Sequence, residues 1–145
     1  MASDGQPIGL EVARTGRLLN RSFDDALAEV GGSLPMWLIV TTLKRGNHAH
    51  QRDIAAAVGL EGATLTHHLH RMEQSGLVAR HRAPTNRRTQ VVELTPAGEA
   101  LFERMRAVVV AFDKRLRRGF SADELDALRE SLERLRTNVG STMSV

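Results

Sequence analysis

Four arginines, Arg80, Arg82, Arg87 and Arg88, lie within nine residues that include no acidic side chain. They occur in the stretch "GLVARHRAPTNRRTQVVELTPAG", in which two runs suited to strands, "LVARHR" and "TQVVEL", flank "APTNRR". A strand, a turn rich in Pro and Asn, and a second strand predict a β-hairpin. Because the planar guanidinium group binds phosphates and base edges well, the hairpin tip is expected to bind a polyanion rather than to be a solvated turn.

Two short helices are expected directly before this hairpin, "HQRDIAAAVG" and "EGATLTHHLHRMEQSG", with glycines at the turn between them. This spacing is typical of a helix-turn-helix. In the second helix Leu65, Leu69 and Met72 recur at helical spacing and predict one buried stripe. The opposite face is free of acidic residues and carries small residues first and hydrogen-bonding residues after them. Its members and their flanking residues are Ala63, Thr64, Thr66, His67, His70, Arg71 and Gln74.

Such a face suits entry into the major groove of DNA, where a close backbone approach and hydrogen-bond donors to base edges are needed. An ordinary amphipathic surface helix would show the same buried stripe. The arginine-rich hairpin that follows favours a winged helix-turn-helix instead. Its basic tip would lie on phosphates or in a narrow minor groove, where arginine is favoured.

These elements together resemble the MarR family of bacterial transcription regulators. The resemblance rests on "QRDIAAAVGLEGATLTHHLHRMEQSGLVAR" followed by "NRRTQVVELTPAG", and "LPMWLIV" looks most like the SlyA branch. It implies a homodimer with two winged heads on a palindromic double-stranded operator, most often a repressor, that responds to small aromatic or anionic ligands. The resemblance makes Thr64, Thr66, His67 and Arg71 contacts of the recognition helix, and Arg88 the wing arginine, which we place on phosphate and minor groove together with Arg87.

Three positions depart from the family pattern. Asn86 stands where an aspartate two residues before the wing arginine is usual, and His67 stands where arginine is common. His50 replaces the Ser or Thr that commonly caps the third helix, which weakens that helix start. The neutral Asn86 is expected to leave the tip more positive and looser.

The predicted fold is mainly α (α+β), with elements in the order α-α-α-α-β-β-α-α and long N- and C-terminal dimerisation helices. We expect one domain over residues 1–145, with a winged head at 34–95 and a helical dimerisation region at 8–30 and 96–140. Apolar stripes that could pair across a two-fold axis, or pack together in one protomer, run through the terminal helices. They comprise Val12, Leu19, Phe23, Ala26, Leu27 and Val30; Leu101, Met105, Val108, Val109, Phe112 and Leu116; and Leu125, Leu128, Leu132, Leu135 and Val139.

An effector site is predicted on the first and second helices. Arg14 and Arg17 lie three residues apart on the first helix and could pair with a carboxylate. Trp37 is the single tryptophan and could equally be a core residue. By resemblance to the SlyA branch, an aromatic carboxylate would bind at Arg14, Arg17 and Trp37.

Other classes of function find little support. His48, His50, His67 and His70 could suggest a histidine-based metal-responsive regulator, but zinc needs three or four converging ligands and the chain has no cysteine. No phosphate-binding loop, nucleophile elbow or metalloprotease motif is present, so we expect neither an enzyme nor a cofactor. A helical protein-interaction module remains the alternative, against which the arginine tip argues.

Charge and hydropathy agree with a regulator of this kind. The net charge is only +3, but 18 of the 20 basic residues are arginine and they cluster. No apolar run approaches the roughly 18 residues of a membrane span, and the N-terminus has no export signal. We therefore expect a cytoplasmic protein without a membrane partner.

Overall fold

The computed structural model describes residues 5–46 and 49–140, apart from the side chains of Ala49 and Arg87. Its elements in chain order are α1 (Ile8–Ala28), α2 (Leu34–Arg45), β1 (Ala49–His50), α3 (Gln51–Val58), α4 (Gly62–Gln74), β2 (Val78–Ala83), β3 (Asn86–Leu94), α5 (Pro96–Leu116) and α6 (Ala122–Asn138). The predicted mainly α fold with a winged helix-turn-helix is confirmed. One element was missed: the two-residue strand β1, which makes the sheet three-stranded.

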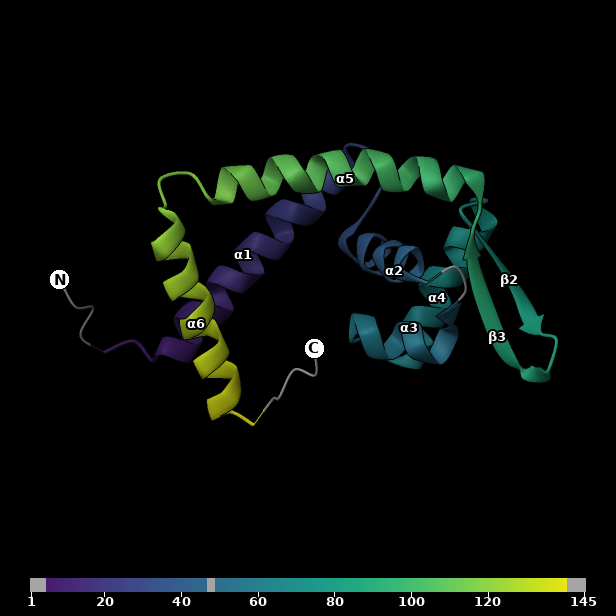
Figure 1. Cartoon of the computed structure of the whole chain (residues 1–145), viewed down its shortest axis with the longest axis horizontal. Coiled ribbons are helices and arrows are strands. Elements are labelled where there is room, and N and C mark those ends of the chain that lie inside the picture. The colour runs from purple at the N-terminus through teal and green to yellow at the C-terminus, as the bar shows by residue number, and fades with distance from the viewer. Residues whose placement is uncertain (1–4, 47–48, 141–145) are drawn as a thin grey trace. The chain divides into compact units, whose positions relative to one another are not determined.

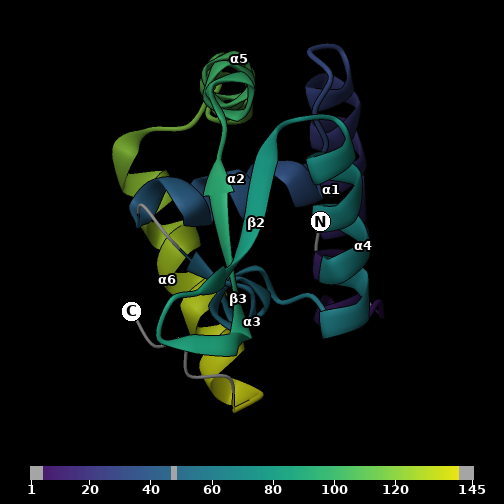
Figure 2. The same ribbon diagram turned by 90° about the vertical axis from the view of Figure 1, so that its right-hand side faces the viewer.

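The chain divides into two compact units after Val110, so that α5 runs across the boundary. The first unit contains the sheet, whose strand order is β1-β3-β2 with both pairs antiparallel. In Figure 1 the hairpin β2–β3 lies at the right-hand end beside α4, and in Figure 2 it faces the viewer, with α4 to its right and α3 behind its lower half.

The core of this unit lies between α2, α3, α4 and the sheet. Ile39 and Val40 of α2, Ile54 of α3 and Val92 of β3 are fully buried. The predicted stripe of α4 is confirmed, because its three members belong to the same cluster. The cluster consists of Leu27, Ile39, Val40, Leu43, Ile54, Leu65, Leu69, Met72, Val78, Val92, Leu101 and Met105.

Helix ends are set largely by local chemistry. Ser33 caps α2 by accepting a hydrogen bond from the Met36 amide, and Asp24 Oδ1 accepts one from the Leu34 amide at 2.7 Å. α3 has no such cap, because His50 makes no capping side-chain bond, as the sequence indicated. Its start is held instead by backbone pairing of His50 with Val91.

Close contacts join the base of the hairpin to the start of α5. The hydroxyl of Thr95 donates to the carbonyl of Gly76 and accepts from the amide of Gly98, which caps α5. A Cβ added at Gly98 would overlap the carbonyl oxygen of Leu77. Only glycine therefore lets α5 approach the start of β2 so closely.

The second unit consists of the end of α5 and α6. Gly119 has φ +85° and lies between the two helices, and Ser121 and Glu124 form a capping box at the start of α6. α6 has no buried residue, and Leu128 keeps 45% of its surface exposed. On α1, in the first unit, Leu18 keeps 60% exposed. Both helices thus carry exposed apolar side chains.

Candidate nucleic-acid interface

α4 presents the face that the sequence predicted. Leu65, Leu69 and Met72 point into the core, with at most 3% of their surface exposed. The expected reading residues lie outside; Ala63, Thr64, Thr66, His67, His70, Arg71 and Gln74 are all exposed. The first turn is small because it begins with Gly62 and Ala63, so that another backbone can approach it closely.

The turn before α4 requires a glycine. Gly59 closes α3 in the left-handed region, at φ +69°, where its amide donates to the carbonyl of Ala55. A residue with a Cβ is strained in this conformation. Gly59 thus permits the sharp change of direction that the helix-turn-helix needs.

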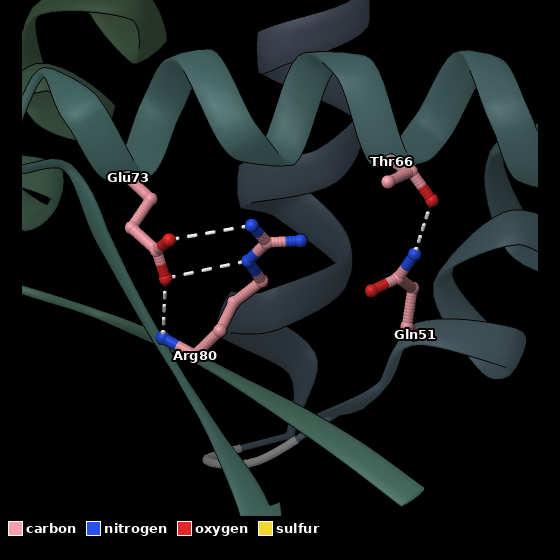
Figure 3. A network of polar contacts seen from close by, with 4 residues as sticks. All are labelled: Gln51, Thr66, Glu73 and Arg80. Carbon is pink, nitrogen blue, oxygen red and sulfur yellow. Dashed lines mark hydrogen bonds and ion pairs between the residues drawn. The ribbon is translucent and has the colours of Figure 1, made fainter.

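Two polar contacts hold α4 near its two ends (Figure 3). Near the start, Gln51 of α3 donates from Nε2 to Thr66 Oγ1 at 2.7 Å, and Thr66 Oγ1 donates to the carbonyl of Gly62 at 2.8 Å. Near the end, Glu73 accepts from Arg80 of β2. Both partners lie outside α4, so the helix is fixed relative to α3 and to the hairpin.

The Glu73–Arg80 contact corrects the sequence-based view of the basic cluster. Arg80 donates to Glu73 from its backbone amide (3.2 Å), from Nε (3.3 Å) and from Nη2 (3.2 Å). The side chain of Arg80 is only 17% exposed. Arg80 is therefore a structural clamp between β2 and α4, and is not part of a free basic tip.

The clamp favours the ionised form of Glu73. The side-chain hydrogen bond from Arg80 lowers the pKa of the Glu73 carboxyl, and burial raises it by a smaller amount. The carboxylate also binds the outward amide of an edge strand, which would otherwise be open to another chain. Glu73 thus binds one backbone amide at the edge of the sheet and neutralises the charge of Arg80.

The tip of the hairpin is formed by Pro84 and Thr85, after which β3 begins at Asn86. The side-chain oxygen of Asn86 accepts a hydrogen bond from the backbone amide of Arg88 at 3.1 Å. Asn86 thus makes a hydrogen bond to the backbone of the wing arginine. Arg88 is exposed, and no carboxylate of the described residues pairs with its side chain. The side chain of Arg87 lies outside the described part of the chain.

α3, the start of α4 and the hairpin surround one open cleft of about 910 Å³. Thr66 and Arg88 both line it, so the structure brings a predicted reading residue and the wing arginine to one place. Gln51, Arg52 and Asp53 line it too; sequence reasoning did not select any of them. Gln51 reaches α4 across 15 positions of the sequence, and no local pattern signals such a contact.

A second cavity, of about 570 Å³, lies among α2, α4 and the end of α1. His68 and Arg71 of α4 and Asp24 of α1 are among its lining residues. Burial lowers the pKa of His68, with further lowering from the nearby His67 and Arg71 charges. His68 is therefore mostly neutral near neutral pH.

The predicted effector residues lie on two different helices, Trp37 on α2 and the two arginines on α1. Trp37 is half-buried and stacks on Phe102 of α5, with ring centroids 5.6 Å apart and planes 3° from parallel. Neither Trp37 nor Arg14 and Arg17 lines either of these two cavities. Arg14 and Arg17 are exposed on α1.

The histidines of the described residues do not converge on a metal site. His48 lies outside the described residues. Among residues 5–46 and 49–140 no three His, Asp or Glu side chains could hold one ion together. The rings of His67 and His68 lie 6.0 Å apart, edge to face.

A helix-turn-helix (α3 and α4) followed by a hairpin wing defines the class of this protein as a winged helix-turn-helix. Residues 33–89 match the model of the MarR family, over α2 and nearly all of the head. Over these residues the chain is similar to the MarR family.

Solved structures resemble nearly the whole chain. A mutant of MarR from E. coli, in complex with operator DNA, has 20% sequence identity and a TM-score of 0.82, with 89% of this chain and 93% of that chain covered. The repressor CouR of Rhodococcus jostii RHA1, bound to a 23-mer DNA duplex, has 25% identity and a TM-score of 0.82, with 89% and 92% covered. BpsR of Bordetella bronchiseptica has 20% identity and a TM-score of 0.82, with 98% and 99% covered.

Proposed function

We propose that this protein is a sequence-specific double-stranded DNA-binding transcription regulator, acting as a repressor. One observation carries the proposal: Thr66, on the exposed, acid-free face of α4, and the exposed Arg88 of the wing line the same cleft. A major-groove helix beside a phosphate-binding arginine needs this arrangement. The resemblance to MarR with operator DNA and to CouR with a DNA duplex supports it.

The proposed roles of the residues are those that the sequence predicts. α4 would enter the major groove and contact base edges through Ala63, Thr64, Thr66, His67, His70 and Arg71. Arg87 and Arg88 would hold phosphates and the minor groove beside it. The lining of the cleft also adds Arg52, whose positive charge favours phosphate, and Asp53, whose negative charge opposes it.

The regulator is proposed to act as a homodimer on a palindromic operator. α1 and α6 each expose apolar side chains, which are costly to leave in water at roughly 25 cal/mol per Å². A second copy would cover them, with residues 34–95 as the head and residues 8–30 and 96–140 as the dimerisation region. Two-fold symmetry of the protein would then match two half-sites about one helical turn apart.

A small aromatic carboxylate is the effector class we propose. CouR has been solved with p-coumaroyl-CoA, and 6-hydroxynicotinic acid regulates DNA binding by BpsR. Arg14, Arg17 and Trp37 stay the proposed ligand residues. Trp37 is the only tryptophan and stacks on Phe102, so its fluorescence should be quenched when salicylate displaces that ring. Unchanged emission up to millimolar salicylate would argue against a site at Trp37.

The remaining proposals concern the general class of the protein and its location in the cell. The protein is proposed to be a cytoplasmic regulator rather than an enzyme, a metal-responsive switch or a protein-interaction module. No helix in the described part of the chain has the length and hydropathy to cross a membrane.

Fluorescence anisotropy with the protein's own upstream DNA and a scrambled duplex tests the function, at about 150 mM salt. A preference of at least about a thousandfold for the upstream DNA is expected for an autoregulating repressor. Equal binding of both duplexes would contradict autoregulation, and no binding of any duplex would contradict the proposal.

Replacing Arg88 by alanine tests the wing. We expect weaker binding of all duplexes and a salt dependence that is flatter by about one unit of slope. Arg104→Ala is the matched control, because it removes the same charge from an exposed position of α5. A changed sequence preference with an unchanged salt slope would show that Arg88 reads bases instead.

A further inference from the structure

The contact between Gln51 and Thr66 determines what Thr66 can offer to a base. The Thr66 oxygen lies 2.7 Å from the Gln51 amide nitrogen and 2.8 Å from the carbonyl oxygen of Gly62 (Figure 3). A hydroxyl group has one hydrogen to donate and two lone pairs to accept with. The hydroxyl can therefore donate in only one of these two contacts and has to accept in the other.

The assignment of donor and acceptor is unique. The Gly62 carbonyl can only accept, so it takes the hydroxyl hydrogen of Thr66. The Gln51 atom that faces Thr66 must then be a donor, which is the amide nitrogen. The hydroxyl has no hydrogen left, and one of its two lone pairs is occupied.

What remains for DNA is the methyl group of Thr66 and one acceptor lone pair. Guanine presents two acceptors in the major groove and needs donors, whereas thymine presents its own methyl group. Thr66 is exposed on the face of α4 proposed to enter that groove. A T·A pair presents a methyl group for the apolar contact and the adenine N6 amino group as a donor to the free lone pair, so it is the base pair that this arrangement favours.

We propose that Gln51 is a positioning residue that makes Thr66 a reader of thymine. Gln51 keeps the hydroxyl turned toward α3, which fixes the rotamer and presents the methyl group. This inference rests on the proposed function and names part of the operator: one T·A pair in each half-site. Loss of one buried methyl contact is expected to weaken binding about fourfold per half-site.

The test begins without a known operator. Purified wild-type protein selects duplexes from a pool with a randomised central segment, and each thymine of the enriched motif is then replaced by uracil, which lacks only the methyl group. We expect one position per half-site at which uracil weakens binding about fourfold. Insensitivity at every position of an enriched motif would overturn the inference and leave the proposed function intact. Failure to enrich any motif would overturn both.

Two variants of Thr66 separate the methyl group from the hydroxyl. Thr66→Val keeps a methyl group in the same place, since valine in a helix has one strongly preferred rotamer, and should keep the uracil penalty. Thr66→Ser keeps the hydroxyl group but has no methyl group, so the uracil penalty should disappear. The reverse pattern would show that the hydroxyl reads the base and would overturn the inference.

Gln51→Ala tests the positioning role. The uracil penalty should shrink because Thr66 can then rotate, whereas Arg88→Ala should weaken binding and leave the penalty unchanged. A thermal melt of each variant checks that the fold is intact. A folded Gln51→Ala protein with the full wild-type penalty would overturn the role of Gln51.

Discussion

The clamp between Glu73 and Arg80 should stabilise the head measurably at neutral pH. Replacing Glu73 by glutamine removes the negative charge but keeps one acceptor oxygen. Three hydrogen bonds of 3.2 to 3.3 Å are affected, one of them from the backbone of an edge strand.

The size of the expected loss of stability follows from how far the side chains of Glu73 and Arg80 are exposed to solvent. Arg80 is 17% exposed but Glu73 is 38% exposed, so solvent screens the pair in part. Exposed ion pairs contribute up to about 1 kcal/mol, and a bond from an amide to a charged group adds to that. We expect Glu73→Gln to lower the free energy of unfolding by about 1 kcal/mol at pH 7.

The lowered pKa of Glu73 determines how the difference in stability changes with pH. The pKa of Glu73 is lower in the folded protein than its ordinary value of 4.5, mainly because of the Arg80 hydrogen bond. Its contribution is therefore complete above pH 4.5 and is lost as the pH falls through the folded pKa. The wild type and Glu73→Gln should differ at pH 7 and converge in acid.

Urea unfolding of both proteins, at one fixed protein concentration, measures this difference; the concentration must be fixed because a dimer's stability depends on it. Glu133→Gln is a suitable control, since Glu133 pairs with Arg136 only on the surface of α6. Equal stability of Glu73→Gln and the wild type at pH 7 would refute the reasoning. So would a difference that persists unchanged in acid.

Two further predictions concern the junction and the wing. Gly98→Ala should destabilise the protein by about 1–3 kcal/mol in the same assay, because the new methyl group would overlap backbone that cannot move aside. Gly9→Ala, which meets nothing within 4 Å, should not, and equal effects of the two would contradict the overlap. Asn86→Asp should keep the hydrogen bond to the Arg88 amide but weaken DNA binding in anisotropy titrations and reduce the salt slope by about one per protomer. Unchanged affinity would mean that the wing does not contact phosphate.

Most of the elements could be predicted from the sequence because local signals mark them. The range of α4, the capping box at Ser121 and the cap at Ser33 depend on residues within one helical turn. β1 could not be predicted, because a two-residue strand has no periodicity and exists only through its pairing with β3.

Only part of the site was accessible in this way. Burial of one stripe of α4 implies exposure of the opposite face, so the exposed reading residues follow from periodicity. The residues that contact α4 from outside the helix cannot be predicted from periodicity. Gln51 and Arg80 come from elements that lie beside α4 only after folding. The count of free arginines in the wing was too high for this reason, because Glu73 pairs with Arg80 across the fold. Whether the exposed residues bind DNA remains a prediction for binding assays.

The hydrogen bonds at Thr95 also bear on how this head can evolve. Thr95 binds both Gly76 and Leu77, so the two ends of the hairpin are fastened to each other at its base. The tip at Pro84 and Thr85 lies at the opposite end of the strands. Insertions or deletions at the tip can therefore change the reach of the wing while α4 and α5 keep their geometry. The wing is thus a part that selection can lengthen, shorten or recharge for a new target without rebuilding the frame that carries it.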